Sequence, residues 1–123
     1  MNPDPQFYMG PANSGAPFHV HNIAVNALIY GRKRWALLPP PAAQYSIRHP
    51  TLTFAELDEA TAKGDPKGMP SFSTSYGGRL AMMQCVQEAG DILMVPDGWG
   101  HSTLNVAESV GWATEYRGFA GWS

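Results

Sequence analysis

Two histidines, His19 and His21, are separated by a single residue in an extended apolar run, residues 17–21. In a β-strand, residues i and i+2 point to the same face, so these imidazoles would project side by side from one wall. Such a pair chelates a divalent metal when a third ligand comes from elsewhere. The best third ligand is His101, which follows a Pro-Asp-Gly turn at residues 96–98. Alone, His-x-His is a weak signal, because most such pairs are surface or satisfied core histidines.

Length and composition limit the range of folds. A chain of 123 residues, 44% of them hydrophobic, suits a single domain, residues 1–123, with one modest core. Its net charge of −2 does not indicate binding to nucleic acid or to an anionic membrane. No apolar run is long enough to span a bilayer. The single cysteine, Cys85, excludes an internal disulfide.

The first residues lack the apolar segment of a signal peptide. They run almost directly into the first strand-like stretch, as expected for the core of something longer. The sequence therefore makes no prediction of cellular location.

Short apolar runs separated by turn residues predict a β-barrel or sandwich. The expected strands are residues 6–9, 17–21, 23–30, 32–38, 80–86, 92–95, 101–106 and 109–116. Between them, Thr53 and Glu56 fit a capping box that would start a helix, and Gly64 would end it. Residues 65–78 have the composition of a long loop. We therefore expect an all-β fold with one short inserted helix, in a helix-plus-loop excursion at about residues 41–79.

Lys33 has an unusual position in the strand pattern. It shares a face of its predicted strand with Trp35 and Leu37, whereas Arg32 and Arg34 share the other face. If the two apolar residues face the core, the lysine faces it as well, and a buried lysine without a partner is costly. Either the strand is shallow and the lysine reaches out to water, or an anion lies inside.

Three stretches, in this order, resemble the JmjC family. They are GPANSGAPFHVH at residues 10–21, YGRKRWALLPP at residues 30–40 and AGDILMVPDGWGHSTLN at residues 89–105. The resemblance covers nearly the whole chain outside residues 41–79. It implies a double-stranded β-helix, the cupin jelly-roll barrel, and an oxygenase that uses Fe(II) and the co-substrate 2-oxoglutarate.

The resemblance also implies roles for particular residues. The family's metal ligands correspond to His19, His21 and His101. Its lysine that binds the distal carboxylate of 2-oxoglutarate corresponds to Lys33, which agrees with the inward orientation inferred above. Asn26 corresponds to a polar co-substrate contact, and Thr114 corresponds to another if the preceding loop is one residue longer here.

The sequence departs from the family pattern near the metal ligands. The usual second ligand is Asp or Glu, which gives a two-His-one-carboxylate site, whereas here it is His21. A closely similar branch of the family, lumenal in eukaryotic cells, also carries His-x-His before a YGRKRW motif. Gly100 stands where an aromatic residue is common. Asn105 falls on a recurrent asparagine after the third ligand, for which we favour a turn-stabilising role.

We therefore expect an Fe(II)/2-oxoglutarate-dependent dioxygenase that hydroxylates or demethylates a protein or peptide side chain, with activity reduced by the histidine at position 21. Two alternatives stay open. One is a three-His cupin dioxygenase that binds a small substrate without 2-oxoglutarate, and Lys33 argues against it. The other is a catalytically inactive barrel that acts as a metal-binding or interaction module, and His21 argues for it.

Overall fold

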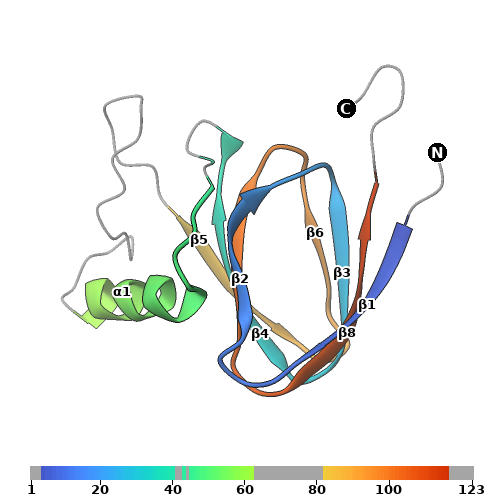
Figure 1. Ribbon diagram of the computed structural model, residues 1–123, viewed down its shortest axis with the longest axis horizontal. Helices are drawn as coiled ribbons and strands as arrows, with labels where there is room; N and C mark the ends of the chain where they lie inside the picture. Colours follow the sequence, from blue (N-terminus) through green and yellow to red (C-terminus); the bar gives the residue numbers. More distant parts are fainter. Residues whose placement is uncertain (1–3, 41–42, 44, 63–81, 117–123) are drawn as a thin grey trace.

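Two facing β-sheets form the protein (Figure 1). The computed structural model describes residues 4–40, 43, 45–62 and 82–116. The elements are β1 (Asp4–Gly10), β2 (Gly15–Val20), β3 (Ala24–Tyr30), β4 (Arg32–Leu38), α1 (Pro50–Ala62), β5 (Met83–Glu88), β6 (Ile92–Val95), β7 (Gly100–Asn105) and β8 (Ser109–Glu115). The strand orders are β1-β8-β3-β6 and β2-β7-β4-β5, with every pair antiparallel. The chain changes sheet at nearly every connection, which confirms the predicted double-stranded β-helix.

Most strand boundaries agree with the predictions to within one or two residues. The turn predicted at Gly31 is confirmed: its φ is +98°, and a Cβ there would lie 2.2 Å from the carbonyl oxygen of Glu108. Only glycine fits both constraints. The predicted loop at residues 65–78 and the predicted helix end at Gly64 lie outside the described residues.

The predicted start of the helix was wrong. Helix α1 begins at Pro50, not after Thr53. Proline suits the first helical position because its fixed φ is already helical and its missing N–H would have no partner there. The His49 ring accepts the N–H of Thr51 at 3.2 Å and so replaces the expected cap. Thr53 is buried inside the helix, and Glu56 instead pairs with Arg48.

The main apolar cluster lies between helix α1 and the β2-β7-β4-β5 sheet. It consists of Phe18, Ala36, Leu38, Phe54, Leu57, Met82 and Leu104. Arg34 of β4 also binds the helix: its guanidinium donates hydrogen bonds of 2.9 and 2.8 Å to the two carboxylate oxygens of Asp58. The same guanidinium lies 4.7 Å from the centroid of the Phe54 ring. The helix therefore covers the outer face of one sheet only (Figure 1).

The interior of the barrel, in contrast, contains many buried polar residues beside its apolar ones. Its buried polar residues include Asn26, Lys33, Gln87, His101, Thr103 and Asn105. Both ends of the Gln87 side-chain amide are hydrogen-bonded. Its oxygen accepts the indole N–H of Trp35 at 2.9 Å, and its nitrogen donates to the backbone carbonyls of Asn26 and Asp91 at 3.0 and 3.2 Å. These bonds join the two sheets across the interior.

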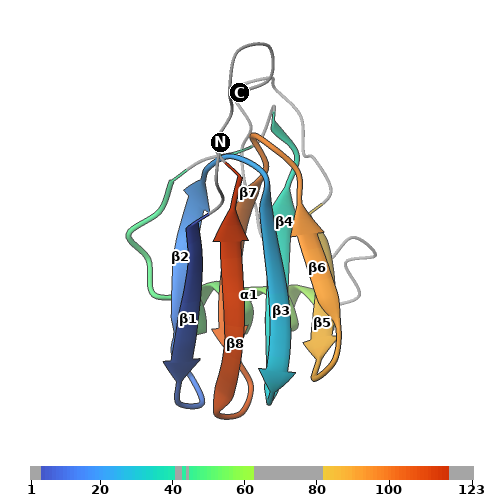
Figure 2. The same cartoon turned by 90° about the vertical axis from the view of Figure 1, so that its right-hand side faces the viewer.

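The outer face of the β1-β8-β3-β6 sheet has no helix over it within the described part of the chain (Figure 2). Large apolar side chains are exposed on it, including Phe7, Ile92, Met94 and Trp112. The rings of Phe7 and Trp112, which are cross-strand neighbours, meet edge to face with centroids 5.4 Å apart. Within the described residues, no helix has the length and apolar character needed to cross a membrane.

Helix packing can be tested with two leucines on opposite faces of α1. Leu57 is 0% exposed, whereas Leu52 is 54% exposed. We expect Leu57→Ala to lower the free energy of unfolding by about 2–5 kcal/mol, because it leaves a cavity against the sheet. The matched control, Leu52→Ala, should stay within about 0.5 kcal/mol. Urea denaturation measures both, and equal losses would contradict the described packing.

Candidate metal centre

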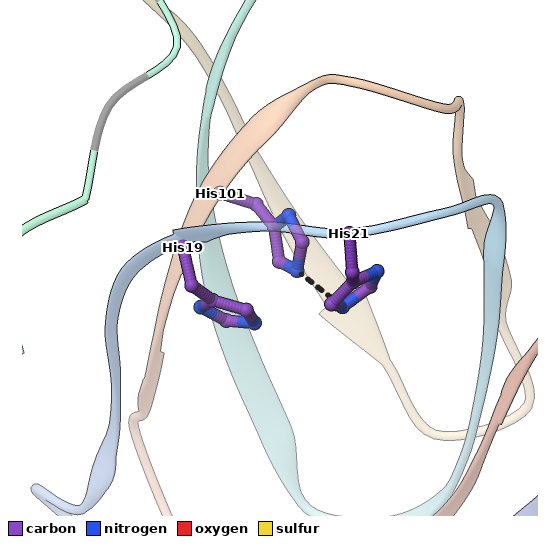
Figure 3. Close-up of side chains that lie close together, drawn as sticks. All are labelled: His19, His21 and His101. Carbon is purple, nitrogen blue, oxygen red and sulfur yellow. Dashed lines mark hydrogen bonds between the residues drawn. The ribbon is translucent and has the colours of Figure 1, made fainter. Parts of the chain in front are cut away.

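The three predicted histidines come together at one end of the barrel (Figure 3). His19 on β2 is the cross-strand partner of His101 on β7, and their ring centroids are 4.0 Å apart. His21 lies just past the end of β2, where its carbonyl accepts the N–H of Gly98 at 3.3 Å. One ligand atom from each ring falls within a group whose members all lie within 4.8 Å of one another.

Backbone carbonyls set the tautomer of each ring. The Nδ1 atoms of His19, His21 and His101 lie 2.7, 2.8 and 3.2 Å from the carbonyl oxygens of Pro17, Asn22 and Trp99. A carbonyl only accepts hydrogen bonds, so each Nδ1 must carry a proton and each Nε2 is left with a lone pair. This outer hydrogen bond is the usual way in which a metal-binding histidine is oriented.

The Nε2 atoms of His21 and His101 lie 3.1 Å apart. Two lone pairs at that distance repel each other unless a cation lies near both. Metal–nitrogen bonds of about 2.1 Å at tetrahedral or octahedral angles place two ligand atoms roughly 3.0–3.4 Å apart. The chemistry of all three neutral imidazoles and the spacing of the His21–His101 pair therefore suit a divalent metal, and the ligand atom of His19 lies within 4.8 Å of both.

Burial favours the neutral form of the His101 and His19 rings. His101 is 3% exposed, and burial lowers its pKa to about 3, with further lowering by His19 and His21. Burial also lowers the pKa of His19, although the Pro17 carbonyl and the Glu115 carboxylate act in the opposite direction. Neutral imidazole is the form that binds metal.

A cavity of about 190 Å³ extends from the three histidines into the barrel. Lys33 lies on its wall with 7% exposure, and its ammonium is 4.1 Å from the centroid of the Tyr8 ring. The Tyr8 hydroxyl donates to Oδ1 of Asn26 at 2.7 Å. The remaining lining is mostly apolar and includes Ala16, Ala24, Val25, Trp35, Val95 and Ala113. The cavity thus has metal-ligand atoms on one wall and a single cation on another.

The structure confirms the predicted inward orientation of Lys33. Arg32 and Arg34, on the opposite face of β4, pair with Glu88 and Asp58 outside. Among the described residues, no carboxylate forms an ion pair with Lys33, and burial lowers its pKa to about 8. A cation held in this way favours an anionic ligand.

The other predicted contacts occupy different positions. Asn26 lines the cavity beside Lys33. Thr114 lines a second cavity instead, and its neighbour Ala113 lines both. Asn105 donates from Nδ2 to Ser14 Oγ at 3.0 Å, in keeping with a turn-stabilising role. No partner meets its buried Oδ1 among the described residues.

Sequence reasoning missed Tyr8 as part of this cavity. Its expected strand was too short for alternation alone to choose an inward face. The signal was Gly111, which lies opposite Tyr8 on β8. A Cβ on this glycine would come within 2.4 Å of the Tyr8 hydroxyl. The missing side chain makes room for the tyrosine.

The second cavity, of about 320 Å³, meets the first at His19 and His21. Its lining also includes Gln6, Ala24, Ala113, Thr114 and Glu115. His19 and His21 therefore line both the inner cavity, whose wall carries the Lys33 cation, and the outer cavity, whose wall carries the acid Glu115.

This arrangement is a cupin-type barrel with a candidate metal centre at one end, and comparison with known proteins identifies its family. The JmjC domain model, described as a hydroxylase, matches residues 6–116. Human JmjC domain-containing protein 8 is 36% identical over 104 residues, which cover 85% of this chain and 34% of that protein. The 2-oxoglutarate and iron-dependent oxygenase JMJD4 of Gallus gallus is 35% identical over 109 residues, covering 84% and 24%. The bifunctional arginine demethylase and lysyl-hydroxylase psr-1 of Caenorhabditis elegans is 31% identical over 110 residues, covering 80% and 26%.

The chain belongs to the JmjC family. It spans about a third or less of the length of these relatives.

The buried lysine gives a prediction about stability. The pKa of Lys33 falls from an ordinary 10.5 to about 8, so between these values the unfolded state binds more protons than the folded state. Stability should therefore rise with pH in this window. Lys33→Met should remove this rise and, at neutral pH, stabilise the metal-free protein by about 1–3 kcal/mol, since the buried charge is gone.

Urea denaturation of each protein at about pH 7 and pH 9.5 gives the change in its free energy of unfolding with pH, which the linkage relation predicts. The values at about pH 7 also give the stabilisation by Lys33→Met. Arg32→Met on the outer face of β4 is the control, and it should keep the rise. A parent protein with the same pH dependence as Lys33→Met would contradict a buried, unpaired lysine.

Proposed function

We propose that this domain is an Fe(II)- and 2-oxoglutarate-dependent oxygenase that hydroxylates or demethylates a protein or peptide side chain. One observation carries the proposal: three convergent imidazole lone pairs and an unpaired buried ammonium line the same small cavity. A dicarboxylate with a 2-oxo acid end is complementary to both, because one end can chelate a metal while the other neutralises a lysine.

Each wall of the cavity has a separate task in this reaction. His19, His21 and His101 would hold the iron, which when bound supplies the redox chemistry by which dioxygen oxidises both 2-oxoglutarate and a C–H bond of the substrate. Lys33 would bind the distal carboxylate. Asn26, held by the Tyr8 hydroxyl at 2.7 Å, would fix the orientation of the co-substrate. The apolar walls keep water out and strengthen these electrostatic contacts.

The protein substrate would approach through the outer cavity, which shares His19, His21, Ala24 and Ala113 with the inner one. The names of two relatives support a protein side chain as substrate, namely an arginine-specific demethylase of Arabidopsis thaliana and the demethylase and lysyl-hydroxylase of C. elegans. A metal-binding module without turnover is the second candidate. His21 favours it, because it replaces a carboxylate ligand with a neutral one.

Divalent metal should stabilise the fold. A ligand that binds only the native state adds about 2.7 kcal/mol at a hundredfold excess over its Kd. Melting temperature should therefore rise with Fe(II) under anaerobic conditions, and also with Mn(II), Ni(II) or Zn(II). His101→Ala removes the buried ligand and should abolish the response, whereas His49→Ala, at the start of α1, should retain it. Unchanged melting with all four metals at neutral pH would sink the metal-site proposal.

Anaerobic titration with Fe(II) and 2-oxoglutarate tests the co-substrate. Chelation of the iron by the 2-oxo acid should produce a weak metal-to-ligand charge-transfer band. Lys33→Met keeps the aliphatic stem but not the charge, so it should abolish 2-oxoglutarate binding and leave metal affinity nearly intact. Arg32→Met removes one positive charge from the other face of the same strand and is the matched control.

Two results would count against this proposal. A parent protein that binds metal but gives no band with 2-oxoglutarate would support the metal-binding module, or a three-His dioxygenase that uses another substrate. Equal 2-oxoglutarate affinity in the parent and in Lys33→Met would rule out the role of the lysine.

A further inference from the structure

The proposed metal centre has an unbalanced charge. A divalent metal with three neutral imidazoles keeps two positive charges, whereas the two-His-one-carboxylate site of related oxygenases keeps one. Lys33 adds another positive charge to the same cavity, and none of the described residues that line this inner cavity is an acid. Positive charge is costly in such a buried place unless a negative group lies close by.

Glu115 is the one acid among the described residues that line either cavity. It is the last residue of β8 and lies in the outer cavity together with His19 and His21. Its Oε1 accepts the N–H of Asn22 at 3.4 Å, next to His21 in the chain. The backbone also holds it there, because Glu115 is the cross-strand partner of Ala24.

The carboxylate lines the same cavity as two of the three histidines, His19 and His21. It is not one of the ligand atoms that lie within 4.8 Å of one another, since that group contains the three histidines alone among the described residues. Glu115 thus faces the metal centre from the cavity wall without belonging to the ligand triad.

We propose that Glu115 supplies, from the wall of the outer cavity, the negative charge that the second ligand provides in two-His-one-carboxylate sites. It acts on the metal from outside the ligand triad, through a bound water or through space. This inference rests on the metal site of the proposed function. In it, Glu115 contributes negative charge near the metal but does not coordinate it.

A matched pair of substitutions tests the inference. Glu115→Gln keeps the shape of the side chain, and its amide oxygen can still accept the N–H of Asn22, so a purely structural role would survive. The loss of the charge should weaken Co(II) binding about tenfold, the lower end for an outer-sphere partner of a metal site. Glu108→Gln removes one charge from the turn before β8, away from both cavities, and should leave the affinity unchanged. Absorption titration with Co(II) alone gives both the Kd and the ligand-field spectrum.

A double-mutant cycle with His21→Asp sharpens the test. This substitution returns a carboxylate to the triad, so the further change Glu115→Gln should then cost much less than tenfold. Coupling of this kind separates compensation of charge from independent effects of the two side chains. Melting temperature without metal, measured on all four proteins, separates loss of metal affinity from loss of fold.

Each outcome has one meaning. Equal Co(II) affinity in the parent, Glu115→Gln and Glu108→Gln overturns the role of Glu115 while the metal site stands. Equal weakening by Glu115→Gln in the parent and in the His21→Asp variant overturns charge compensation. A parent that binds no Co(II) overturns the metal site of the proposed function itself.

Discussion

Burial of helix α1 against the β2-β7-β4-β5 sheet is the interaction on which the rest of this small barrel depends. The apolar cluster lies between the helix and the outer face of that sheet, and both Phe54 and Leu57 of the helix are fully buried there. A barrel of this size usually fills its interior with apolar side chains. Here the interior holds polar residues and a cavity beside its apolar side chains, so much of the apolar packing comes from outside. The inserted helix is therefore a structural requirement of the candidate site.

The buried polar groups of the interior require a second stabilising feature, which is hydrogen bonding between them. Gln87 satisfies the Trp35 indole and two carbonyls, and thereby joins β4, β5 and β3 beneath the cavity. Unpaired buried polar groups cost about 1–3 kcal/mol each, so this network is necessary for folding as well as for shape. Two groups are exceptions among the described residues: Oδ1 of Asn105 has no partner, and the only close partner of the Lys33 ammonium is the Tyr8 ring. The unpaired charge of Lys33 is a sign of function, because stability alone would favour its removal.

Sequence reasoning predicted the architecture well because two kinds of signal agreed. Strand alternation indicated that Lys33 faces inward, and the family resemblance assigned it a role; the structure confirms the orientation. The start of α1 was predicted wrongly because a capping-box pattern is local, whereas burial of Thr53 against the sheet decides where that residue lies. Tyr8, Gln87 and Glu115 were missed for a related reason. The partners of each of these side chains depend on the register between neighbouring strands, and the sequence of a single strand does not show that register.

In the proposed site, a histidine in place of a carboxylate changes both the length and the charge of the second ligand. These two changes have separate structural consequences. An imidazole is longer than a carboxymethyl group, and β2 accordingly ends at Val20, so that His21 projects from the loop while its carbonyl is held by Gly98. Gly100, next to His101 in the chain, pairs with Val20 across the strands. The change in charge cannot be absorbed by backbone geometry, because a neutral ligand leaves the metal one unit more positive whatever its position. In the proposed arrangement the compensating acid comes from another strand: Glu115, at the end of β8, accepts a hydrogen bond from the loop after His21 and lines the same cavity as His19 and His21.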